Sequence, residues 1–246
     1  MANSFFKSSN PVLDDDRYQK AALSAGYTNG GIMTVEGAVN KSLILGSIML
    51  AAAAFSWVMP NMIFLWGGAI GGFICVLVAC FRPQHSPILA PLYAVLEGLF
   101  LGTASLAYAG LYGGIVFKAL TLTIGLLFLM LFLYKTGVIK VTDKLRSGIM
   151  MATGAIMLMY LFTWILRMFG VNMPLFHQGG MLGIGISLVI IGIASMNLLL
   201  DFDSFEKGAQ AQAPKYMEWF SAMGLLVTLV WLYLEILRLF SKLSRD

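Results

Sequence analysis

Charged residues are scarce in this 246-residue sequence. Asp, Glu, Lys and Arg together make up 11% of it, whereas hydrophobic residues make up 59% and the mean hydropathy is +0.83. Soluble proteins carry about 25% charged residues, so this chain has too little polar surface to cover a soluble globule. The shortage excludes soluble enzymes, nucleic-acid-binding proteins and disordered chains. It indicates that lipid surrounds most of the protein.

Two other features are missing from the sequence. Its two cysteines, Cys75 and Cys80, lie five positions apart in an apolar run and match neither a redox CxxC motif nor a metal-ligand spacing. The segment Met1–Asn40 contains no apolar stretch behind a basic one, so we expect no cleavable signal peptide. The first membrane span must then direct insertion itself.

What the sequence does contain is seven long apolar runs. Most exceed the roughly 20 residues that cross about 30 Å of hydrocarbon as a helix. Two breaks are short, at Pro60-Asn61 and at 110–114, but one helix over 43–81 would be about 58 Å long, so each break must be a tight hairpin. We therefore predict an all-α polytopic membrane protein. Its parts are a cytosolic tail at 1–42, seven transmembrane helices at 43–59, 62–81, 88–109, 111–134, 148–169, 179–200 and 219–240, and a C-terminal tail at 241–246.

The distribution of basic residues predicts the orientation. Cytoplasmic loops of membrane proteins carry an excess of Lys and Arg. With the amino terminus in the cytosol, eleven basic residues fall on the inner side, namely Lys7, Arg17, Lys20, Lys41, Arg82, Lys135, Lys140, Lys144, Arg146, Lys207 and Lys215. The first two outer loops have no basic residue, Arg167 lies beside the third outer loop, and Lys242 and Arg245 lie on the tail. We expect a cytosolic N-terminus, an outer C-terminus and a bacterial plasma (inner) membrane.

Ionisable residues within membrane spans are costly and are functional candidates by default. Glu97 lies about 14 Å along the third span, near the midplane. Lys118 can reach the interface with its long side chain. Glu235 and Arg238 lie three residues apart on the seventh span, so the arginine could neutralise the carboxylate locally.

Asp201 closes the sixth predicted span, with Asp203 and Glu206 just beyond it at the cytosolic surface. Acids at a helix end are commonly only solvated, so this group has both a structural and a functional interpretation.

Glycines spaced four residues apart predict where helices pack closely, because small residues let two backbones approach. They are Gly67, Gly68, Gly71 and Gly72 on the second span, Gly98 and Gly102 on the third, and Gly179 and Gly183 on the sixth.

Several segments resemble one membrane-protein family. The run LEGLFLG at 96–102, the turn LDFD at 200–203, the opening SNPVL at 9–13 and above all WLYLEILRLF at 231–240 are similar to the bacterial branch of the Bax inhibitor-1-like family (transmembrane Bax inhibitor motif, YccA-like). The resemblance covers essentially the whole chain. It implies six helices around a central seventh and a pH-sensitive calcium leak.

The resemblance also implies a sensor. In the family an acid after the sixth span and one in the seventh share a proton, and an arginine at the end of the second can bridge to them. By motif these are Asp201, Glu235 and Arg82 here. The sequence departs from the pattern in having Glu235 in place of an aspartate and 33 residues between the two acids. Because this connection is long, Glu97 with Glu235 is the alternative pair.

Carboxylate chemistry suggests how either pair would act. Two carboxyl groups close together in a low dielectric cannot both be ionised cheaply, so they share one proton. Deprotonated, they offer the oxygen ligands that Ca²⁺ prefers, so Asp201 and Glu235 are candidates for transient calcium binding. Calcium or protons would then be the ions handled, and no resident cofactor is expected.

Two other classes of function are considered. A membrane scaffold could regulate partners such as a membrane-bound quality-control protease through the N-terminal tail and the loop at 201–215. An intramembrane enzyme is disfavoured, since the sequence has no HExxH or GxSxG motif. His85 and His177 also lie in loops on opposite faces. We therefore predict that the protein is not an enzyme.

Overall fold

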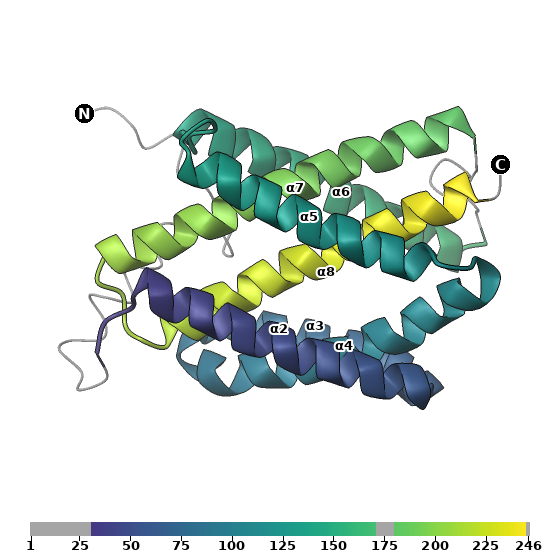
Figure 1. Cartoon of the computed structure of the whole chain (residues 1–246), viewed down its shortest axis with the longest axis horizontal. Coiled ribbons are helices and arrows are strands. Elements are labelled where there is room, and N and C mark those ends of the chain that lie inside the picture. Colours follow the sequence, from purple (N-terminus) through teal and green to yellow (C-terminus); the bar gives the residue numbers. More distant parts are fainter. Residues whose placement is uncertain (1–30, 171–179, 245–246) are drawn as a thin grey trace. The chain divides into compact units, whose positions relative to one another are not determined.

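The computed structural model describes residues 31–170 and 180–244, and in these ranges the chain is almost wholly helical (Figure 1). Seven of its helices are long and apolar enough to cross a membrane. They are α2 (Val35–Val58), α3 (Met62–Phe81), α4 (Ser86–Leu111), α5 (Ile115–Lys135), α6 (Asp143–Met168), α7 (Met181–Gln210) and α8 (Met217–Leu243). A short 3₁₀ helix, η1 (Pro83–His85), leads into α4. The all-α class with seven candidate spans is thus confirmed, whereas a central position for the seventh stays a prediction.

Local signals explain where the helices begin and end. Thr34 caps α2, its Oγ1 accepting the backbone N–H of Gly37 at 2.9 Å, and Asn61 caps α3 in the same way through Ile63. Capping side chains of this kind satisfy N–H groups that the first helical turn leaves without an intrahelical acceptor. Between α4 and α5, Gly114 has a φ of 76°, a left-handed conformation that glycine adopts without strain.

Several helices run beyond the apolar stretches that predicted them. α7 continues to Gln210, so Asp201 lies within the helix instead of closing it. α8 continues to Leu243, so Lys242, expected on the C-terminal tail, lies in the last helical turn. The apolar run marks the part of a helix that lipid can surround, while the backbone hydrogen bonding continues through polar residues until a turn interrupts it.

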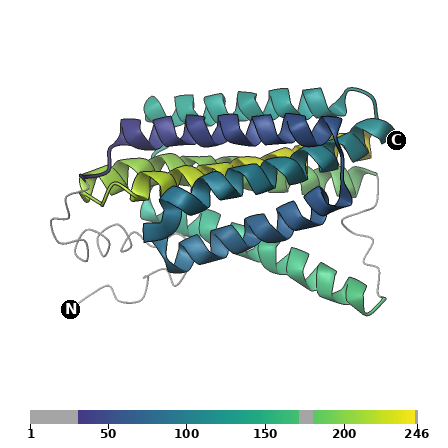
Figure 2. The same ribbon diagram turned by 90° about the horizontal axis from the view of Figure 1, so that it is seen from below.

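The chain divides into two compact units. The first comprises the chain up to Leu106 together with Asp203–Leu226, and the second comprises Ala107–Phe202 and Val227–Asp246. Within the first unit, α4 lies beside α2 and α3 (Figure 1 and Figure 2).

Glycines on α4 and α3 explain this close packing. A Cβ on Gly98 would meet the backbone of Met49 on α2, and one on Gly102 would meet the backbone of Ala53. On α3, Gly68 faces the backbone of Leu96 in the same way. The close approach predicted from the glycine spacing is therefore confirmed for α4 and for one face of α3. By contrast, Gly67 meets only a side chain of its own helix.

The first unit also contains a contact between segments far apart in the sequence, which we call the N-terminal clasp (residues 31–34 with 213–218). Met33 donates its N–H to the carbonyl of Ala213 at 2.7 Å, and Ile32 pairs with Pro214 in an isolated antiparallel bridge. The buried Glu218 carboxylate accepts the N–H of Thr34 at 3.1 Å and its hydroxyl at 3.2 Å. The clasp joins the start of α2 to the start of α8.

In the second unit, polar and aromatic contacts connect α5, α6 and α7. Asn197 of α7 donates to the Thr153 hydroxyl of α6 at 2.8 Å. The rings of Tyr134 on α5 and Phe202 on α7 lie 6.0 Å apart, a separation typical of tilted aromatic pairs.

A candidate charge network on α8

Within the second unit, one face of α8 carries a series of polar side chains. Thr228, Glu235, Arg238 and Lys242 follow one another at intervals of seven, three and four residues. At 100° per residue these four positions lie within an arc of about 80°. The helix is otherwise mainly apolar and buried, so these four residues form a polar face on a membrane-spanning helix.

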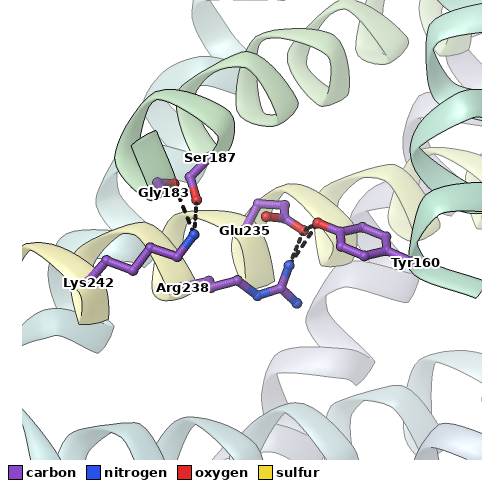
Figure 3. Close-up of polar contacts among 6 residues, drawn as sticks. All are labelled: Tyr160, Gly183, Ser187, Glu235, Arg238 and Lys242. Carbon is purple, nitrogen blue, oxygen red and sulfur yellow. Dashed lines mark hydrogen bonds and ion pairs between the residues drawn. The ribbon is translucent and has the colours of Figure 1, made fainter. Parts of the chain in front are cut away.

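Glu235 is at the centre of this face. Only 1% of the residue is exposed. Its Oε1 accepts hydrogen bonds from the Tyr160 hydroxyl of α6 and from Arg238 Nη1, the latter at 2.7 Å. Arg238 Nη1 also donates to the Tyr160 oxygen at 2.8 Å, and its guanidinium lies 5.3 Å from the centre of the tyrosine ring (Figure 3). One oxygen of Glu235 is therefore bound by two side chains, one from α6 and one from α8.

Electrostatics explains why these groups gather. A charge in a low-dielectric environment is tolerated when it is paired and hydrogen-bonded. The Glu235 side chain is 2% exposed, whereas that of Arg238 is 36% exposed, so the carboxylate is the more deeply buried partner. Its second oxygen, Oε2, is buried and accepts no hydrogen bond from the described residues. The site thus has an acceptor atom available to a proton or a cation.

At each end of the polar face, a residue of α8 contacts α7. The Asp201 side chain on α7 is hydrogen-bonded to Thr228 on α8. At the other end, Lys242 Nζ donates to the Gly183 carbonyl at 3.0 Å and to the Ser187 hydroxyl at 2.9 Å (Figure 3). The Asp201–Thr228 and Ser187–Lys242 contacts lie 14 positions apart on each helix, so α7 and α8 run antiparallel in a fixed register.

This register shows how the two predicted sensor acids lie. Thr228, which binds Asp201, precedes Glu235 by seven residues, a rise of about 10.5 Å along the helix. Glu235 is bound to Tyr160 and Arg238 instead. In this conformation the two carboxylates are therefore held by different partners, at successive levels of the same helix pair.

The other predicted site residues belong to the first unit. Glu97 is buried on α4, and its carboxylate lies against Gly72 of α3, where the missing side chain leaves the space. Arg82 is exposed and directly follows α3. Lys118 is exposed in the first turn of α5 in the second unit.

The sequence did not point to Tyr160 or Ser187. One lies 75 residues from Glu235 and the other 55 residues from Lys242, and neither belongs to a recognisable motif. Lys242 could have been found, since it lies seven residues after Glu235 and thus on the same helical face.

On the polar face, the carboxyl groups of Asp201 and Glu235 are the candidate ligands for a metal ion. Over residues 31–170 and 180–244, no three His, Cys, Asp or Glu side chains come together in a way that could hold a metal. Ca²⁺ takes six to eight oxygen ligands. Asp201 and Glu235, which lie at different levels of the helix pair, could each supply only part of a calcium shell.

The seven apolar helices and their buried charges define an integral membrane protein. The chain belongs to the Bax inhibitor 1 like family, whose sequence model matches residues 4–245. Comparison with curated proteins and with solved structures gave no significant match. The SNPVL segment at 9–13 and His177 lie outside the described residues.

Proposed function

We propose that this protein is a pH-sensitive calcium leak channel, and that the Glu235–Arg238–Tyr160 network is its gate. The observation that carries the proposal is the buried Glu235 carboxylate in a membrane-spanning helix, bound by an arginine and a tyrosine. Intramembrane carboxylates are rare and mark ion pathways and proton relays. Membership of the Bax inhibitor 1 like family supports the same function.

The gate works through the charge of Glu235. When ionised, the carboxylate binds Arg238 on its own helix and Tyr160 on α6, and so it holds α8 against α6. A proton on Glu235 removes the charge that Arg238 binds and weakens both contacts. The network then releases α8, and calcium can pass.

Asp201 is the second acid of the pathway in this proposal. It lies at the level of Thr228, about two helical turns from Glu235. When Glu235 is protonated, the Asp201 carboxylate and the neutral Glu235 carbonyl oxygen offer successive oxygen ligands to a permeant cation. The protein would then be a leak and not an enzyme, with its N-terminus in the cytosol, its C-terminus outside and the bacterial plasma membrane as its location.

Purified protein in liposomes that contain a calcium-sensitive dye tests this function. Calcium flux should vary with pH in the wild type. Glu235→Gln should leak at every pH, because the amide is permanently uncharged, and Tyr160→Phe should leak at higher pH than the wild type. Glu36→Gln is the matched control, because Glu36 is an exposed carboxylate in the first turn of α2.

Two results would contradict the proposal. Absence of flux from the folded wild-type protein at any pH would favour a scaffold that regulates partners such as a membrane-bound protease. A Glu235→Gln protein that keeps the wild-type pH response would show that the gate lies elsewhere.

A further inference from the structure

Lys242 is a buried cation held by neutral groups. It lies in the last turn of α8 with 4% of the residue exposed. Its ammonium donates to the carbonyl of Gly183 and the hydroxyl of Ser187, both on α7 (Figure 3). These acceptors stabilise the ammonium without cancelling its charge.

The neighbouring carboxylate is already occupied. Glu235 forms its ion pair with Arg238 at 2.7 Å. In the part of the chain that the structure describes, no ion pair joins Lys242 to an acid. This half of α8 therefore carries two cations and one carboxylate, and the positive charge of Lys242 remains in excess.

The position of Lys242 matters for ion movement. It lies seven residues after Glu235, on the same helical face and about 10.5 Å further along α8. An ion that follows this polar face between Glu235 and the carboxyl end of the helix must pass close to the ammonium. In surroundings with little water, like charges repel far more strongly than they do in bulk solvent.

We propose that Lys242 is an electrostatic barrier at the carboxyl end of the polar face of α8, which limits the flux of cations through the leak. This inference rests on the proposed function. A barrier of this kind acts on the charge of the ion, so the energy that opposes Ca²⁺ is twice the energy that opposes K⁺. Rates depend exponentially on barrier energy, so the slowing of Ca²⁺ is the square of the slowing of K⁺, and an anion is not slowed.

A purely structural role for Lys242 predicts a different pattern. If the lysine only fastens α8 to α7, its loss loosens the helix pair and changes the flux of every ion by a similar factor. Ser187→Ala would then resemble Lys242→Gln, because each removes the same hydrogen bond. Under the barrier model Ser187→Ala and Lys242→Arg keep the positive charge and also keep the wild-type ratio of Ca²⁺ to K⁺ flux.

The experiment measures K⁺, Ca²⁺ and Cl⁻ fluxes in liposomes for the wild type, Lys242→Gln, Lys242→Met, Lys242→Arg and Ser187→Ala. Lys118→Gln, which removes an exposed lysine from α5, is the matched control. We expect Lys242→Gln to raise K⁺ flux by some factor, to raise Ca²⁺ flux by about the square of that factor, and not to raise Cl⁻ flux. Lys242→Met provides the same test with an apolar side chain suited to a buried position if the glutamine variant does not fold.

The outcomes separate the two proposals. Equal changes for all three ions, or a Ser187→Ala protein with the same altered ratio, would overturn the barrier while leaving the leak intact. A wild-type protein that conducts none of these ions would overturn the leak itself, and the barrier with it.

Discussion

Arg238 lies one turn after Glu235 on α8 and places its Nη1 2.7 Å from Glu235 Oε1. Because both residues belong to one helix, this ion pair moves with the helix and cannot by itself hold α8 to a neighbour. The Tyr160 hydroxyl supplies that connection, since it donates to the carboxylate and accepts from the guanidinium. The neutral tyrosine is thus the member of the network that converts the charge of Glu235 into contact between helices.

Replacing Asp201 should have a different effect from replacing Asp203. Asp201→Asn removes a charge that is hydrogen-bonded to Thr228 on the polar face of α8, so we expect the pH dependence of calcium flux to change while the protein stays folded. Asp203 forms a salt bridge with Lys207 one turn further on. Pairs of this kind contribute up to about 1 kcal/mol, so Asp203→Asn should change flux little. Equal effects of the two substitutions in the liposome assay would indicate a response to general surface charge.

Glu97→Gln tests whether the buried acid of the first unit takes part in conduction. The amide keeps the shape that fits against Gly72 and removes the charge. If Glu97 takes part in conduction, the Glu97→Gln protein should have a lower calcium flux than the wild type. Its thermal stability should be unchanged or raised, since a buried charge costs several kcal/mol. We expect this loss of flux. Wild-type flux and pH response in the variant would exclude Glu97 from the pathway.

Gly102→Ala should destabilise the protein. A Cβ at this position would meet the backbone of Ala53, which cannot give way as a flexible side chain could. Overpacking of this kind typically costs 1–3 kcal/mol. Gly125→Ala on α5 is the control, because a Cβ there meets nothing within 4 Å. Thermal unfolding in detergent should show a lower Tm for Gly102→Ala alone, and equal stabilities would mean that α2 and α4 can separate without cost.

A reporter fused after Asp246 should be accessible from outside the cytosol. This follows from the eleven basic residues that fall on the inner side when the N-terminus is cytosolic. An impermeant labelling reagent applied to intact cells measures that accessibility. Labelling only after the cells are opened would show that the seventh helix does not end outside.

The helices could be predicted from the sequence because a long apolar run in lipid has no alternative to a helix that satisfies its own backbone. The Glu235–Arg238 pair could also be predicted, since residues three apart on a helix are neighbours. Tyr160 and Ser187 could not, because their contacts depend on the rotation and register of α6 and α7 against α8. The place of Lys242 on the polar face could be predicted from its spacing to Glu235, but its burial could not, because the apolar run ends before it.

The N-terminal clasp has a consequence for biosynthesis. Thr34 and Glu218 are 184 positions apart, so six long helices are synthesised after Thr34 before its buried acidic partner exists. Contacts between such distant residues form late, because the intervening chain must first be brought together. The Thr34 N–H therefore spends most of translation without its native acceptor. Closure of this contact marks the moment at which the last helix has reached its place beside the first described one.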